Sequence, residues 1–175
     1  MSDAASKVVL ELNDKMVQEI SYGVHRTLSS VFGLNPVAGK HFVADEHSSQ
    51  GDISGFVTLS QDRVEGALIV TFPQDTIFGI LGRLYKRQFT EIDKSVRQGV
   101  GEVTNMVFGV FKTNLINYGF SFKMVIPSVV IGEAHKVSIY MPGKTLVIPF
   151  ETEVGSFKVM LLLYPEEMVK FNVAV

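Results

Sequence analysis

The most regular hydrophobic pattern of the chain lies between Glu91 and Tyr118, a stretch that contains no proline. Apolar residues recur there at intervals of three and four, namely Ile92, Val96, Val100, Val103, Val107 and Val110. Because an α-helix turns by about 100° per residue, these side chains share one face. The spacing predicts one long helix over residues 91–117, with its valine face packed on the rest of the protein.

The opposite side of this predicted helix carries a second set of residues at the same spacing: Gln98, Glu102, Asn105, Gly109 and Lys112. Gly101 and Gly109 each cost about 1 kcal/mol relative to alanine inside a helix. Asn105 competes for backbone hydrogen bonds and is also a poor choice there. A face that keeps such residues, with a carboxylate and an amide as its projecting groups, suggests a docking site. The alternative is a solvated face with two incidental glycines.

Two further helices are predicted, one before and one after a hairpin whose strands cover residues 53–60 and 64–72. The first begins at Asn13 or Asp14 and ends near Gly33; its apolar side contains Met16, Val17, Ile20, Val24, Leu28 and Val31. The second follows Pro73, which suits the first turn of a helix; its inward residues are Ile77, Ile80, Leu81 and Leu84.

Strand-like patterns make up most of the remaining chain. They cover residues 41–44, 53–60, 64–72, 120–131, 135–141, 146–152 and 157–164. Helices that are segregated from antiparallel strands are typical of an α+β fold. We therefore expect helices packed on one face of a largely antiparallel β-sheet, with residues 1–12 as an N-terminal tail and residues 13–175 as a single domain.

Composition narrows the classes of function. The 175 residues include no cysteine, which excludes disulfides, cysteine nucleophiles and thiolate metal sites and is compatible with a reducing cytoplasm. The net charge is -2, with both signs interspersed, so nothing attracts the protein to nucleic acid or to an anionic membrane. The amino terminus lacks the features of a signal peptide, and the longest apolar run is far too short to span a bilayer. We expect a cytoplasmic protein.

Familiar catalytic and metal-binding patterns are missing from the sequence. The four histidines make no pair spaced for metal binding, and residues 45–52 lack the spacing of an EF-hand. No nucleophile elbow, phosphate-binding loop or dinucleotide fingerprint is present. We expect no metal and no cofactor of the protein's own.

The run GEVTNMVFG, from Gly101 to Gly109, resembles the E-x-x-N motif and flanks of the CheX/CheC chemotaxis phosphatases. These enzymes remove phosphate from the aspartyl-phosphate of the response regulator CheY. The resemblance extends upstream through PQDTIFGILGRLYKRQF and GDISGFVTLS and downstream through FSFKMVIPSVVIGE, over about residues 14–164. The chain has one E-x-x-N pattern, as in CheX, whereas CheC has two. It departs from the family at Gln98, where an acidic residue or serine is common.

The resemblance implies roles for particular residues. Glu102 and Asn105 would be catalytic: Asn105 would orient the attacking water, and Glu102 would pair with a lysine of the regulator. Gln98, Gly101, Met106 and Gly109 would contact the partner. That partner would be a phosphorylated CheY-type receiver domain carrying Mg²⁺, and the protein would be a homodimer. Two alternatives remain: a module that binds a regulator or another signalling protein without hydrolysis, and, less well supported, a small-molecule enzyme.

Overall fold

The computed structural model describes residues 10–44, 51–61, 64–118, 120–123, 126–135, 144–164 and 169–172. Three α-helices are present in these residues: α1 (Asp14–Phe32), α2 (Gln74–Tyr85) and α3 (Lys94–Leu115), which continues into a short 3₁₀ turn, η1 (Ile116–Tyr118). The strands are β1 (Leu10–Asn13), β2 (Val37–Ala38), β3 (Phe42–Ala44), β4 (Gly51–Gln61), β5 (Val64–Phe72), β6 (Ser128–His135), β7 (Thr145–Thr152), β8 (Gly155–Tyr164) and β9 (Val169–Asn172).

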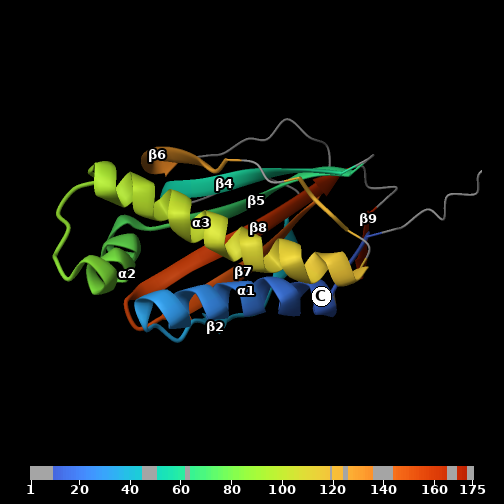
Figure 1. Ribbon diagram of the computed structural model, residues 1–175, viewed down its shortest axis with the longest axis horizontal. Helices are drawn as coiled ribbons and strands as arrows, with labels where there is room; N and C mark the ends of the chain where they lie inside the picture. The colour runs from blue at the N-terminus through green and yellow to red at the C-terminus, as the bar shows by residue number, and fades with distance from the viewer. Residues whose placement is uncertain are drawn as a thin grey trace, which may run out of the picture.

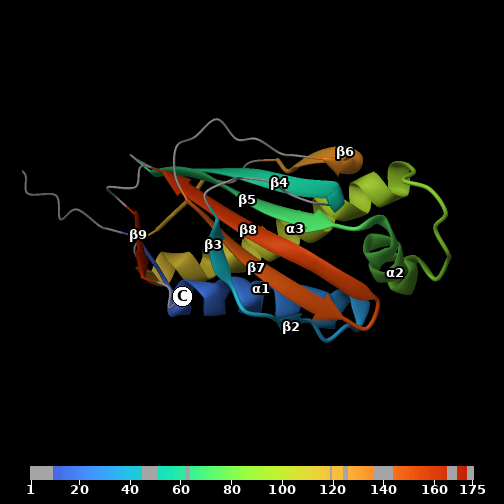
Figure 2. The ribbon, with the colours of Figure 1, turned by 180° about the vertical axis from the view of Figure 1, so that it is seen from behind.

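The main sheet has the order β2-β7-β8-β5-β4-β6, and β3 also pairs with β7. Every pairing in this sheet is antiparallel, whereas β1 and β9 form a separate parallel pair. The three helices lie on one face of the sheet, with α1 and α3 side by side along it and α2 at one end (Figures 1 and 2). The expected α+β architecture is therefore confirmed.

The main core lies between the helices and the sheet. Val96, Val100, Val103 and Val107 are buried on α3, as the sequence pattern predicts, while Ile92 and Val110 are half-buried. Phe108 and Phe111 are also buried on α3 although the valine pattern omits them, so the core face of the helix is wider than the repeat alone indicates.

The helix α1 ends where Gly33 follows Phe32. Gly33 has a φ of +62°, a left-handed conformation that suits glycine, and the Leu34 N–H donates to the Leu28 carbonyl at 3.2 Å. The Gly33 N–H donates to the Ser29 carbonyl, also at 3.2 Å, which is the hydrogen bond of the αL motif at a helix C-terminus. The predicted end of the helix near Gly33 is confirmed.

Several predicted boundaries differ from the structure. Residues 10–12 of the expected tail belong to β1. Against the predicted 91–117, α3 begins at Lys94 because Asp93 caps it, and it ends at Leu115, where the 3₁₀ turn η1 follows. Pro73 precedes α2 as its N-cap, and Leu84 is 46% exposed and not part of the core. The strands β1, β2 and β9 are not predicted from the sequence, because each has at most four residues and shows no periodic signal of its own.

The predicted strand over residues 120–131 is wrong at residues 120–123 and 126–127, and residues 124–125 lie outside the described residues. Phe120 and Phe122 are buried, but the strand β6 begins only at Ser128. Pro127 comes directly before it and has no N–H to donate to a neighbouring strand. Residues 136–141 of the predicted strand 135–141 lie outside the described residues, and His135 ends β6.

No helix in the described part of the chain is long and apolar enough to cross a membrane.

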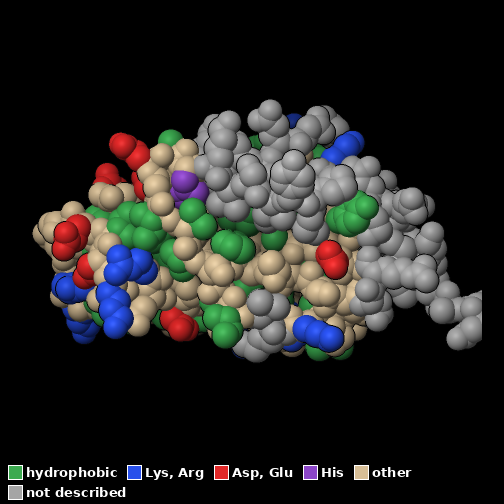
Figure 3. Space-filling model, turned by 90° about the horizontal axis from the view of Figure 1, so that it is seen from above, with side chains coloured by type: hydrophobic (Ala, Val, Ile, Leu, Met, Phe, Trp, Pro, Cys, Tyr) green, Lys and Arg blue, Asp and Glu red, His purple; other side chains and the backbone are tan. Residues whose placement is uncertain are grey.

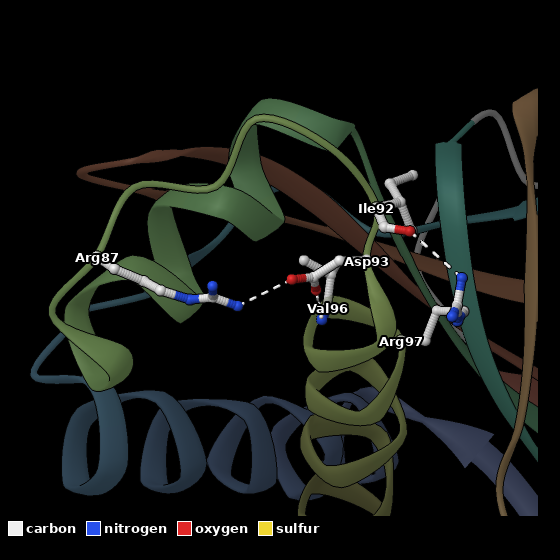
Figure 4. Close-up of polar contacts among 5 residues, drawn as sticks. All are labelled: Arg87, Ile92, Asp93, Val96 and Arg97. Atoms are coloured by element: carbon white, nitrogen blue, oxygen red, sulfur yellow. Dashed lines mark hydrogen bonds and ion pairs between the residues drawn. The ribbon is translucent and has the colours of Figure 1, made fainter.

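Asp93 fixes the start of α3, as Figure 4 shows. Its side chain accepts a hydrogen bond of 2.8 Å from the Val96 N–H, and the other carboxylate oxygen lies 2.9 Å from Nη2 of Arg87. On the other side of the cap, Arg97 donates to the Ile92 carbonyl at 3.4 Å. The hydrogen bond from Val96, assisted by Arg87, holds the pKa of Asp93 below its ordinary value.

Replacing Asp93 by alanine is expected to lower the thermal midpoint at pH 7, because the helix loses its cap. A carboxyl whose pKa is lower in the folded state stabilises the protein above its unfolded pKa and loses this effect as pH falls through the folded pKa. The difference between Asp93→Ala and the unmodified protein should therefore shrink below the ordinary value of 3.8. Thermal melts from pH 7 to pH 2.5 test this. An equal difference at both ends would contradict it.

Candidate functional site

The residues expected to form a docking site lie along one side of α3. Gln98, Glu102 and Gly109 are exposed, and Asn105 is half-buried between them. We call these four residues the open face of α3. They lie opposite the valines that pack on the sheet, so the structure brings together the polar residues that the sequence pattern groups.

Glu102 and Asn105 are three residues apart, which places their Cβ atoms about 5–6 Å apart on neighbouring turns. Within the described residues, no cation forms an ion pair with Glu102. A carboxylate on a rigid helix that has no cation partner among the described residues is available to a cation on another molecule.

Asn105 has an unusual environment for a residue on this side of the helix. Its side-chain carbonyl oxygen is buried and accepts no hydrogen bond from the described part of the chain. A buried polar atom without a partner costs about 1–3 kcal/mol. Such atoms are rare in folded proteins, and functional sites are one place where they persist.

The two glycines of the motif region play different parts. A side chain added at Gly109 would meet no heavy atom within 4 Å, so the helix backbone is open to a partner there. A side chain added at Gly101 would lie 3.8 Å from the Val129 side chain on β6, and Gly101 is only partly exposed. Gly109 therefore leaves space for another molecule, whereas Gly101 faces a strand of the same chain.

Met106 lies beside the open face, where α3 packs on α1. A groove of about 580 Å³ runs between these helices. It is lined by Arg26, Thr27, Ser30 and Val31 of α1 and by Met106, Gly109, Val110, Thr113 and Asn114 of α3. Val110 was expected to be part of the core and instead lines this groove. The α1 half of the groove could not be found from sequence, because its residues are distant in the chain from the E-x-x-N region.

The position of α3 beside α1 is fixed by close contacts at two points along the helix pair. A side chain at Gly23 would lie 3.2 Å from the Val107 carbonyl, so α1 approaches the α3 backbone at this glycine. At the far end, Asn114 and Tyr118 both donate hydrogen bonds to the Glu19 carboxylate, at 2.6 and 3.0 Å. The open face is thus presented by a helix whose position the core determines.

In the described residues, no group of three or more histidine, aspartate or glutamate side chains is placed to hold a metal ion.

Comparison with solved structures gives the same fold. A CheC-like superfamily protein from Shewanella sp. PV-4 has a TM-score of 0.81 and 25% identity, over 88% of this chain and 100% of that one. The chemotaxis protein CheX from Desulfovibrio desulfuricans has a TM-score of 0.78 and 27% identity, over 86% and 99% of the two chains. A chain from the CheX-CheY-BeF3-Mg²⁺ complex of Borrelia burgdorferi has a TM-score of 0.70 and 22% identity, over 86% and 98%.

No curated protein matches the chain at the sequence level. The family model described as chemotaxis phosphatase CheX matches residues 53–151, more than half of the chain, and this range includes α2, α3 and the open face. The chain therefore belongs to the CheX family of chemotaxis proteins.

Proposed function

We propose that the protein is a phosphatase that hydrolyses the aspartyl-phosphate of a CheY-type receiver domain, with Glu102 and Asn105 as its catalytic residues. The observation that carries the proposal is the open face of α3, where both side chains project one turn apart from a rigid helix. The family supports the reaction class. The Borrelia CheX complex, which contains CheY, BeF3 and Mg²⁺, supports the class of partner.

In the proposed reaction a water attacks the phosphorus of the aspartyl-phosphate, and the bond from phosphorus to the aspartate oxygen breaks. The products are an aspartate carboxylate and inorganic phosphate. The receiver supplies the phosphorylated aspartate, a bound Mg²⁺ and a lysine. It lacks a group that holds the water in line with the leaving oxygen, and this is the contribution of the phosphatase.

The amide of Asn105 is suited to this task because it is neutral. It can hydrogen-bond a water without bringing a second negative charge close to the phosphoryl oxygens. Its carbonyl oxygen has no hydrogen-bond partner in the described chain, so in the proposed reaction this oxygen is left for the attacking water.

Glu102 is proposed to position the receiver. Its carboxylate has no cation partner among the described residues and would pair with the receiver's lysine. Gly109 would let the receiver approach the helix backbone, and Met106 would contact it from the adjoining groove. Gln98, one turn before Glu102, stands where the family often has an acidic residue or serine and would make a neutral polar contact. Gly101 would support the interface from its position beside β6.

A binding module without catalytic activity is the second candidate. Gln98 at a position that is often acidic in the family favours this alternative. Measured with a large excess of phosphorylated receiver, a phosphatase releases many equivalents of phosphate per protein. A binding module releases none beyond the receiver's own rate.

Asn105→Ala is expected to reduce turnover by about 10² or more and to leave the affinity for the receiver nearly unchanged, because it removes an interaction made mainly in the transition state. The variant should also be more stable, by about 1 kcal/mol or more, since it loses a buried carbonyl without a partner and gains a better helix former. Phosphate release and thermal unfolding measure the two effects. Turnover at the unmodified rate would remove Asn105 from the mechanism.

Glu102→Ala is expected to weaken binding of a beryllofluoride-loaded receiver by about 1–3 kcal/mol, because the receiver's lysine loses its partner. A smaller loss of turnover at saturation should follow from poorer alignment. The matched control is Glu65→Ala, which removes an exposed carboxylate from the other face of the sheet. Equal affinities for the two variants would contradict the assigned role of Glu102.

We also propose a homodimer, on the basis of the family resemblance. The apolar residues Val159–Leu163 of β8 provide no surface for a second chain, because β8 lies between β5 and β7 and these residues are buried within one chain. A more suitable surface is β6, which pairs only with β4 among the described strands and leaves Ile131 44% exposed. Figure 3 shows this side of the molecule, where hydrophobic side chains gather near charged groups of both signs.

Sedimentation is expected to show a species of twice the chain mass of 19.3 kDa. Ile131→Lys should shift it toward the monomer, because a charge on an exposed strand edge opposes edge-to-edge pairing. A single monomeric species for the unmodified protein across micromolar concentrations would refute the homodimer.

A further inference from the structure

One close contact between α3 and the sheet is made by Thr104, the residue that precedes Asn105. A methyl group added at Gly55, in the middle of β4, would be 2.0 Å from Oγ1 of Thr104 and 2.9 Å from its Cβ. It would also be 3.2 Å from a methyl of Val100. Ordinary van der Waals contacts of a Cβ atom begin at 3.4 Å, so the helix lies on the strand at a distance that only glycine permits.

Thr104 is a rigid contact at this point. Its side chain is completely buried, and its hydroxyl donates a 2.8 Å hydrogen bond to the Val100 carbonyl one turn earlier in α3. A β-branched side chain that is tied to its own helix has few other rotamers. A larger residue at position 55 would therefore displace the helix, because Thr104 cannot rotate away.

The next residue in the chain is Asn105. Helix geometry places successive side chains 100° apart on one rigid cylinder, so the depth and rotation of Thr104 in the core set the position of Asn105 on the open face. The chemical step is sensitive to this position, since a displacement of about 1 Å in a catalytic group can cost about 10² in rate. A flexible, exposed carboxylate such as Glu102 tolerates the same displacement better.

We propose that Gly55 and Thr104 form a positioning pair that sets the depth of α3 on the sheet and thereby places the Asn105 amide for catalysis. This inference depends on the proposed phosphatase activity. It assigns to a buried glycine of β4 a role in the rate of the reaction, separate from its contribution to stability.

The test is a size exchange between the two positions. Gly55→Ala should lower kcat by at least 10-fold and change the Kd for a beryllofluoride-loaded receiver by less than about 3-fold, because alignment is lost while docking is kept. Thr104→Gly alone should also lower kcat, since it leaves a cavity under the helix. The double variant Gly55→Ala with Thr104→Gly should recover most of the rate. Glycine and not alanine is required at position 104, because the Cβ of Thr104 already lies 2.9 Å from the methyl that Gly55→Ala would add.

The matched control is Gly79→Ala. Here the added methyl would lie 2.7 Å from Val154, so it disturbs the contact of α2 with the turn between β7 and β8 and not the contact of α3 with β4. This variant should lose thermal stability and keep the kcat of the unmodified protein. If Gly55→Ala does not fold, Thr104→Gly and the double variant still form the comparison.

A second readout does not depend on activity. The side-chain amide resonances of Asn105 in ¹H–¹⁵N spectra should shift in Gly55→Ala or Thr104→Gly and return toward their original positions in the double variant. A Gly55→Ala protein with kcat within 2-fold of the unmodified protein would overturn the positioning role. The positioning role would also be overturned if the kcat of the double variant were no higher than the kcat of the slower single variant.

The failure of the proposed function is distinguishable from these outcomes. An unmodified protein that releases no phosphate from any CheY-type receiver would refute the phosphatase, and the Asn105 resonances would then decide the positioning role. Asn105 resonances that are unchanged in both single variants would refute the positioning role of Gly55 and Thr104.

Discussion

The packing of α3 on the sheet is the constraint on which the rest of the structure depends. Val100, Val103 and Val107 bury one side of the helix, and Gly55 of β4 lets Thr104 reach the strand. Buried aliphatic side chains of this kind contribute about 1.5–3 kcal/mol each. Since interiors are close-packed, a helix held in this way has one rotation and one depth. The residues of the open face therefore have a fixed arrangement, and this arrangement is stabilised by the core and not by the open face itself.

Because the buried side of α3 supplies the stability of the helix, the open face can contain residues that are unfavourable in a helix. Gly109 and Asn105 are unfavourable in a helix, and Asn105 has a buried carbonyl oxygen with no partner in the described chain. The core on the other side of α3 can offset these costs, so the exposed side is free to serve binding and catalysis. Proteins often keep less stable arrangements at functional sites for this reason.

The proposed chemistry also explains why sequence motifs of ordinary enzymes are missing. An aspartyl-phosphate on a receiver domain arrives with its leaving group, metal ion and lysine already assembled. The phosphatase then needs only a docking surface and one group to hold a water, which an exposed helix can supply without a deep pocket. The structure has such a helix, and under the proposed function its site would be completed by the partner.

The sequence by itself determined the elements with a strong local signal. The three-and-four spacing of the valines predicted α3 and its exposed residues, Gly33 marked the end of α1, and the flanks of Glu102 and Asn105 indicated the family. It could not show that Asn105 has a buried oxygen without a partner among the described residues, that α1 forms a groove with Met106, or that Gly55 lies against Thr104. These features join residues from separate elements, and contacts between distant parts of a chain leave no periodic trace in either part. The same reason explains β1 and β9: each is too short to be recognised alone, and only their pairing in the folded chain defines them as strands.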